Sequence, residues 1–271
     1  MKLFDTHCHL DDERFSEDRD QLIQALPKQG LVSCVTVGSD LASSERSIAL
    51  AHQYAHIYAA AGVHPHEVSK APADYLSRLR LLLKTPKVVA LGEIGLDYYY
   101  DFSPRETQKE ILTQQLDLAY ELKMPVILHV RDAHGDMIDL LRNLGERRPS
   151  GVLHCFSGSA ESALEYVRMG FYISFAGPVT FKNAGKLLLA AQAVPAGRLL
   201  IETDSPYLAP VPMRGKRNDP SLVRHVCAKL AELRGMTAED MAELTCGNAQ
   251  RFFGIPEPGT PGEDCDFVTE R

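Results

Sequence analysis

The sequence places histidines and acidic residues directly at the ends of short apolar segments. The first of these segments ends in His7-Cys8-His9. Alternate residues of a strand point to the same side, so both imidazoles should face one way and Cys8 the other. Later segments end in four further candidates of the same kind, namely Glu93, His129, His154 and Asp204. Neutral imidazole and ionised carboxylate are the ligands that divalent metal ions accept in mixed nitrogen–oxygen sites.

A single histidine near the end of a strand is more often a hydrogen-bonded structural residue than a ligand. Burying six titratable groups without partners, however, would cost several kcal/mol for each of them. Six ligands exceed what one tetrahedral zinc with an open position needs, and a bridging carboxylate suits two ions about 3.5–4 Å apart. The sequence therefore predicts two divalent cations. Zn²⁺, Mn²⁺ and Mg²⁺ all accept such a mixed set, so the residues do not distinguish between them.

Eight short apolar segments, each ended by turn residues, are typical of β-strands. They cover residues 2–9, 31–37, 57–64, 88–96, 126–130, 151–156, 171–175 and 199–202. Helical patterns lie between or after them at 18–26, 43–54, 75–83, 137–144, 160–169, 184–193, 220–233 and 238–253. A further helix is expected to start with Ser103 as its N-cap and Pro104 as its first residue. The alternation predicts parallel strands joined by crossover helices.

A closed (β/α)₈ barrel, the TIM barrel, is the predicted architecture, and an open doubly wound sheet is the alternative. Eight strands with polar residues at their ends favour the barrel, and no glycine-rich dinucleotide turn follows the first strand. The C-terminal ends of barrel strands meet at one mouth, so all six candidate ligands should lie there. One domain is expected over residues 1–254, with the Pro- and Gly-rich acidic residues 255–271 as a flexible tail.

Charge and composition restrict the partners. The formal net charge of −7 argues against a protein that coats duplex nucleic acid, which usually needs a broad basic face. It does not exclude an enzyme that binds one phosphate, because two divalent ions supply about four positive charges locally. No apolar run approaches the roughly 20 residues of a membrane span, and no export signal is recognised. The six cysteines are therefore expected as reduced thiols in a cytoplasmic protein. The sequence leaves the oligomeric state open and is compatible with a monomer.

Six segments in combination resemble the TatD family of metal-dependent deoxyribonucleases, which belongs to the amidohydrolase-like barrels. The segments are DTHCHL (5–10), GVHP (62–65), GEIGLDYY (92–99), HVRD (129–132), HCFSG (154–158) and ETDSPYLAP (202–210). Other barrels of this superfamily bridge two metals with a carbamylated lysine on the fourth strand. Glu93 stands on that strand here, which separates the chain from the cyclic-amide hydrolases.

The resemblance also assigns roles to the six candidates. It implies that His7 and His9 bind one metal, and that Glu93 bridges the two metals. It implies that His129 and His154 bind the second metal. The Asp204 position then completes the first site and takes the proton of the attacking water.

Contacts to substrate are expected beside these ligands. The resemblance places His64 at a substrate phosphate; the spacing of His64 and His66 also allows His64 to be a ligand, and His66 is expected in a loop. Arg131 can donate to a phosphate oxygen through its planar guanidinium, or form a structural ion pair with Asp132.

Two further segments carry candidates for substrate binding. Arg214 and Lys216 lie in residues 213–218, the densest basic stretch near the predicted mouth, and are candidates for a phosphate; a solvated loop is the alternative. An exposed tyrosine can stack on a base, which makes Tyr98 a candidate among three consecutive tyrosines. Packing at the barrel rim is the alternative for all three.

The predicted function is that of a divalent-metal-dependent phosphodiesterase that trims DNA, and RNA as a further possibility, from single-stranded 3′ ends. An ester or amide hydrolase on the same metals, such as one that removes the aminoacyl group from tRNA, is one alternative. A non-catalytic metal-binding barrel is another, and the complete ligand set with Asp204 argues against it.

Overall fold

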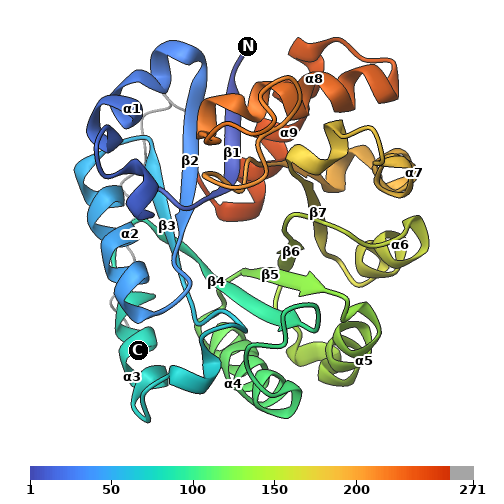
Figure 1. Cartoon of the computed structure of the whole chain (residues 1–271). Coiled ribbons are helices and arrows are strands. Elements are labelled where there is room, and N and C mark those ends of the chain that lie inside the picture. The colour runs from blue at the N-terminus through green and yellow to red at the C-terminus, as the bar shows by residue number, and fades with distance from the viewer. Residues whose placement is uncertain (257–271) are drawn as a thin grey trace.

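The computed structural model describes residues 1–256 and contains one eight-stranded parallel sheet. The strands follow in chain order, β1 to β8, with each paired to the next. They are β1 (Leu3–Cys8), β2 (Leu31–Val37), β3 (Ile57–Ala61), β4 (Val88–Asp97), β5 (Val126–Arg131), β6 (Gly151–Leu153), β7 (Tyr172–Phe175) and β8 (Leu199–Ile201). Figure 1 shows the strands at the centre of a surrounding ring of helices. The predicted TIM barrel is confirmed, and the open doubly wound sheet is excluded.

Residues of the predicted site themselves close the barrel between its last and first strands. The backbone N–H of Asp204 donates to the His7 carbonyl oxygen at 2.9 Å. The N–H of His9 donates to the carbonyl oxygen of Ser205 at 2.7 Å. The ends of β8 and β1 are therefore held side by side, which brings the first and last candidate ligands together although about two hundred residues separate them in the chain.

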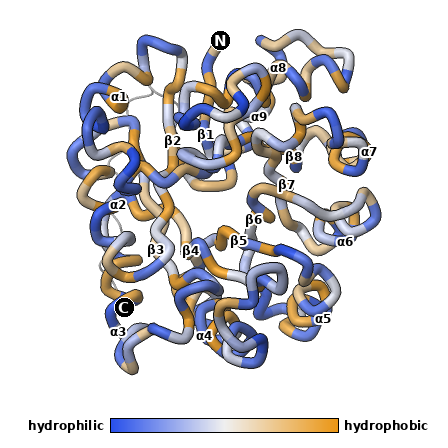
Figure 2. The backbone as a smooth tube through the Cα atoms, in the orientation of Figure 1, coloured by the Kyte–Doolittle hydropathy of each residue, from blue (hydrophilic) through white to orange (hydrophobic). Residues whose placement is uncertain are grey.

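The described residues form nine α-helices at the predicted places. They are α1 (Arg19–Ala25), α2 (Leu41–Gln53), α3 (Tyr75–Leu82), α4 (Arg105–Leu122), α5 (His134–Leu144), α6 (Ala160–Arg168), α7 (Gly185–Ala193), α8 (Val223–Arg234) and α9 (Ala238–Phe253). Hydrophilic and hydrophobic residues alternate along their turns (Figure 2), as expected for helices with one face on a sheet. None of these helices, within residues 1–256, combines the length and hydropathy needed to cross a bilayer.

The start of α4 differs from the prediction. Pro104 is the N-cap and makes no side-chain capping bond, while Arg105 is the first helical residue. The Ser103 hydroxyl instead donates to the His66 carbonyl oxygen at 3.4 Å. Tertiary contact between the loops after β3 and β4 has overridden the local capping signal.

An apolar cluster fills the barrel at the end opposite the predicted site. Inward side chains of the strands meet the end of α9 there, and the rings of Phe4 and Phe253 lie 5.9 Å apart. Ile255 is buried in the same cluster, so the packed part of the chain extends beyond residue 254. The expected flexible tail otherwise falls mainly on residues 257–271, which lie outside the described residues. The residues of the predicted site lie at the opposite end, where the strands end.

Candidate metal centre

The carboxylate of Glu93 lies between two groups of histidines. Its Oε2 atom is 3.3 Å from Nε2 of His7 and 3.8 Å from Nε2 of His9. Its Oε1 atom is 2.9 Å from Nδ1 of His129 and 2.7 Å from Nε2 of His154. Each oxygen therefore faces a different set of imidazoles, which is the arrangement that a bridging ligand requires.

Asp204 belongs to the group that contains His7 and His9. Its Oδ1 atom is 3.4 Å from Nε2 of His9 and 3.9 Å from Nε2 of His7. The ligand atoms of these three residues all lie within 4.8 Å of one another. Asp204 has a φ of +56°, in the left-handed region that Asp tolerates better than most residues. This turn directs the carboxylate back toward β1 immediately after β8.

Acceptors behind the imidazoles determine which nitrogen faces the centre. Nδ1 of His9 lies 2.9 Å from the Val37 carbonyl oxygen, which can only accept, so Nδ1 carries a proton and the lone pair of a neutral ring is on Nε2. Nε2 of His129 lies 2.9 Å from Oδ2 of Asp97, which directs its Nδ1 lone pair to the centre in the same way. Such partners orient metal-binding histidines and raise their basicity.

His154 is held by an acidic residue that closes the same side of the centre. Its Nδ1 atom is 3.3 Å from Oε1 of Glu202, and that oxygen also accepts from the backbone N–H of Cys155 at 2.6 Å. The Nε2 atom of His154 is therefore left to face Glu93. A mixed set of imidazole and carboxylate groups, with His9, His129 and His154 oriented from behind, fits divalent cations.

Unlike His9 and His129, His64 turns a protonated nitrogen toward the centre. Its Nδ1 atom accepts a hydrogen bond from the backbone N–H of His66 at 3.1 Å, so the proton of the neutral ring is on Nε2. That Nε2 lies 3.3 Å from Oε1 of Glu93. Burial lowers the pKa of His64 to about 4, which keeps the ring neutral. His64 thus presents a donor to the centre, which suits an anionic oxygen better than a metal ion.

Three acidic residues near the centre were not among the candidates from the sequence. Asp97 contacts both His129 and His66, and Glu202 contacts His154. Asp5 accepts from the Thr203 hydroxyl at 2.6 Å, where β1 meets the end of β8. A signal for them existed, because Asp5 and Asp97 lie at even spacing from His7 and Glu93 within one strand. Glu202 lies two residues before Asp204. His66, expected in a loop, also belongs to this network through Asp97.

Electrostatic interactions hold the carboxylates of Glu93 and Asp204 ionised and protonate several histidines when no cation neutralises them. Burial opposes ionisation of Glu93, but the neighbouring histidines keep its pKa well below the usual range. Burial also opposes the charged form of His9, yet the hydrogen bond to Asp204 and the charge of Glu93 raise its pKa to about 9. The pKa of His154 is raised in the same way by Glu93 and Glu202, against burial. A bound cation would take the place of these protons.

The stabilisation that a divalent cation confers should therefore grow with pH between about 6.5 and 9. The raised pKa of His9 stabilises the metal-free protein fully below its unfolded value of 6.5, and this contribution is lost as the pH rises through about 9. Displacing the proton also costs a cation about 1.4 kcal/mol for each pH unit below the pKa. The measurement is the difference in Tm between EDTA-treated and Mg²⁺-saturated protein across this range. A difference that stays constant or shrinks with pH would contradict the expectation, and His9→Ala should flatten the trend.

The candidates on the β4 and β5 side contact other residues of the barrel rim. The Arg131 guanidinium lies 3.8 Å from the ring centre of Tyr99 and, within residues 1–256, forms no ion pair with Asp132. The Tyr98 hydroxyl donates to Asp136 of α5 at 2.7 Å. The Arg105 guanidinium also covers the Tyr98 ring at 4.3 Å. Tyr98 is thus committed to the helices, and the more exposed aromatic rings of this loop are its neighbours.

The basic loop after β8 lies beside the loop after β7. Arg214 stacks on Phe181 at 3.8 Å, and with Lys182 it lines a hollow of about 330 Å³ at the barrel mouth. Lys216 is exposed. Arg217 is engaged by Asp18, with contacts of 2.7 and 2.6 Å. Two cations of this loop are therefore available to an anion, and the third is held in an ion pair.

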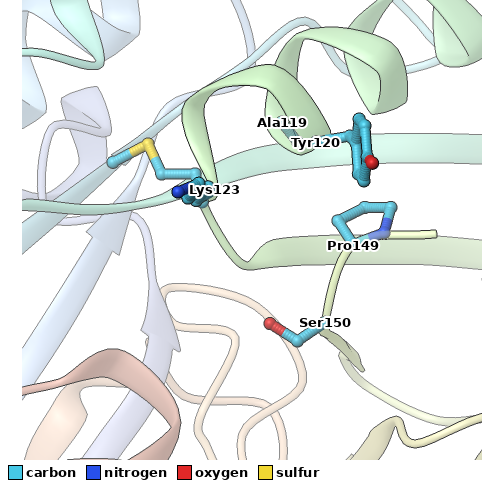
Figure 3. Close-up of a pocket in the computed structure, with 6 residues that line it drawn as sticks. Ala119, Tyr120, Lys123, Pro149 and Ser150 are labelled. Atoms are coloured by element: carbon cyan, nitrogen blue, oxygen red, sulfur yellow. The ribbon is translucent and has the colours of Figure 1, made fainter. Parts of the chain in front are cut away.

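A second hollow lies far from the candidate metal centre. It measures about 200 Å³ and lies between the end of α4 and the segment before β6 (Figure 3), with Tyr120, Lys123 and Pro149 in its lining. Both segments precede strands, so they lie at the N-terminal end of the barrel. Nothing in this lining resembles a catalytic set.

Comparison with known sequences relates the chain to one family. The family described as TatD related DNase matches residues 4–254. The metal-dependent hydrolase YabD of Bacillus subtilis is 44% identical over 253 residues, covering 93% of this chain and 99% of the relative. The 3′-5′ ssDNA/RNA exonuclease TatD of Enterobacter lignolyticus is 37% identical over 258 residues, with coverages of 93% and 99%.

A solved structure supports the same relation. The crystal structure of YjjV, a TatD homologue from Escherichia coli K12, superposes with a TM-score of 0.88 at 34% identity. The similarity covers 94% of this chain and 98% of that one. The fold and the sequence segments around the centre therefore point to the same group of proteins.

Proposed function

Because this chain belongs to the family of TatD-related deoxyribonucleases and is a metal-dependent hydrolase, we propose that it removes nucleotides from the 3′ ends of single-stranded DNA and RNA. The relative from Enterobacter lignolyticus carries this activity in its name. The net charge of −7 fits contact with a chain end rather than with continuous duplex.

The proposal rests above all on Glu93, whose two carboxylate oxygens face two separate sets of histidines. We assign His7, His9 and Asp204 to one cation, and His129 and His154 to a second, with Glu93 shared. When bound, such a pair of divalent cations lowers the pKa of water and offsets the charge gained by an attacked phosphorus.

Asp204 and His64 have protonation states that suit their proposed roles. The pKa of Asp204 is lowered, against burial, by the hydrogen bond to His9, so the carboxylate is ionised and can accept a proton from the attacking water. It can then return that proton to the leaving oxygen. His64 keeps its Nε2 proton, and this N–H group donates a hydrogen bond to a non-bridging phosphate oxygen. Arg131 supplies a positive charge on the same side of the mouth.

A survey of products tests this proposal against its alternatives. The metal-loaded protein is incubated with single-stranded DNA, single-stranded RNA, duplex DNA and aminoacyl-tRNA, each with Mg²⁺, Mn²⁺ or Zn²⁺. Nucleoside 5′-monophosphates released from 3′ ends support the proposed activity. Free amino acid with intact nucleic acid would instead identify an esterase, and no product under any condition would identify a binding protein.

Substitution of the basic loop should separate phosphate binding from metal chemistry. Arg214→Ala/Lys216→Ala should cost about 1–3 kcal/mol in kcat/KM on an oligonucleotide, mostly through KM, because remote contacts act alike in ground and transition states. The salt dependence of single-strand binding should flatten by about 0.7 for each lost contact. The loss should be much smaller on a short activated phosphodiester that does not reach the loop.

Arg217→Ala is the matched control, because Asp18 already engages that cation. It should leave the salt dependence close to that of the wild type, and metal content should be normal in both proteins. Equal losses on long and short substrates, or an unchanged salt slope in the double variant, would show that the loop is only solvated surface.

A further inference from the structure

Three aromatic side chains project from the loop that follows β4. Tyr99, Tyr100 and Phe102 are 58%, 47% and 66% exposed. The rings of Tyr100 and Phe102 are stacked with centres 5.1 Å apart, and Tyr99 meets Tyr100 edge to face at 4.9 Å. With the Arg131 guanidinium on Tyr99, these residues form a surface that we call the aromatic shelf.

The shelf is fixed to the metal centre rather than to a free loop. Oδ1 of Asp97 accepts from the backbone N–H groups of Tyr99 and Tyr100 at 3.0 and 2.9 Å. Oδ2 of the same carboxylate contacts Nε2 of His129 at 2.9 Å. One side chain therefore positions both the shelf and a proposed metal ligand.

A ring contact joins the shelf to the phosphate donor. The His66 imidazole lies edge to face against Tyr100 at 5.3 Å and Phe102 at 4.9 Å. The His66 ring is also 4.3 Å from the ring of His64. A molecule that lies on the shelf and extends past His66 thus brings an attached anionic group to the Nε2–H donor of His64.

We infer that the aromatic shelf stacks an unpaired nucleobase of the substrate strand, within a few nucleotides of the bond that is cut. This inference rests on the proposed function and adds the element that recognises single strands. The exposed part of the Tyr100–Phe102 stack, next to an anion site, matches the base and phosphate of one nucleotide. It accepts all bases because each has a π face. Arg131 provides charge complementary to the strand. Bases inside a duplex are already stacked and paired, so the shelf selects unpaired ends.

Abasic substrates test the inference without altering the protein. Single strands carry one abasic residue at successive positions from the 3′ end, and kcat/KM is measured with metal-loaded wild-type protein. One or two positions should lower kcat/KM by about 5- to 100-fold, the size of effect expected for a lost stacking contact. Equal rates at all positions would overturn the shelf.

Variants then locate the contact. Tyr100→Ala/Phe102→Ala should lower kcat/KM on the intact strand by a similar factor. For this variant, an abasic residue at the sensitive position should cause no further loss of kcat/KM. If the loss from the double substitution and the loss from the abasic residue added up at every position, the inference would be overturned. Tyr100→Phe keeps the ring and should retain the sensitivity of kcat/KM to the abasic position. Tyr120→Ala is the matched control, since Tyr120 is also 47% exposed but lines the hollow at the far end of the barrel.

A binding measurement keeps failure of the shelf distinct from failure of the proposed function. Metal-loaded protein is titrated with a phosphorothioate single strand that carries 2-aminopurine at the sensitive position. The fluorescence change should be present in wild type and lost in Tyr100→Ala/Phe102→Ala. Wild type that neither binds nor cleaves single strands would overturn the proposed function and the shelf with it. If the wild type cleaves single strands and the double variant cleaves them equally well, the shelf alone would be overturned.

Discussion

Glu93→Gln should empty both halves of the metal centre and abolish turnover. The amide fills the same space but presents only one oxygen, so it cannot face both sets of histidines as the carboxylate does. Changes in outer residues alone cost about 10- to 100-fold in metal affinity, and loss of the shared ligand should exceed that. Elemental analysis of protein loaded with a defined excess of metal gives the stoichiometry, and single-strand hydrolysis gives the rate.

Variants of single ligands provide the comparison. His7→Ala and His154→Ala remove ligands of different ions, so each should lower the metal content and the rate while retaining more metal than Glu93→Gln. If either protein had full metal occupancy and normal turnover, the assignment of that ligand would be wrong. If Glu93→Gln kept two tightly bound ions, the carboxylate would not be the shared ligand.

Asp204→Asn should separate proton transfer from metal binding. The amide still occupies the space between β8 and β1 and coordinates weakly, but it cannot accept a proton. We expect kcat to fall by about 10²- to 10⁴-fold, with at least one metal retained and little change in KM. Steady-state kinetics with metal analysis of the same preparation is the measurement.

Asp97→Asn is the matched control for this change. Asp97 contacts His129 and His66 but lies behind the ligand, so its loss should weaken metal binding by about 10- to 100-fold. The rate of the Asp97→Asn variant should recover when excess metal is added, whereas the rate of Asp204→Asn should not. An Asp204→Asn protein that keeps most of its kcat would mean that another group accepts the proton.

The order of elements and the types of ligand could be predicted from the sequence. The eight strand and nine helix patterns appear at the expected places, because apolar periodicity and turn residues are local properties. Parallel strands with crossover helices have few possible arrangements, so local patterns were enough to predict the barrel. The same rule brought His7, Glu93 and Asp204 to one mouth despite their separation in the chain.

Contacts between distant segments decided what the local patterns left open. The alternation of side chains along a strand specifies the face on which a histidine lies, but not the rotation of its ring. Asp97 determines this rotation for His129, and the backbone N–H of His66 determines it for His64. Beyond the end of a strand this alternation of side chains no longer applies. The tyrosines after β4 were therefore equivalent in sequence, until Asp136 of α5 engaged Tyr98 and Asp97 turned the next two outward. Only the packing of neighbouring elements brings these partners within hydrogen-bonding distance, and no local sequence pattern encodes that distance.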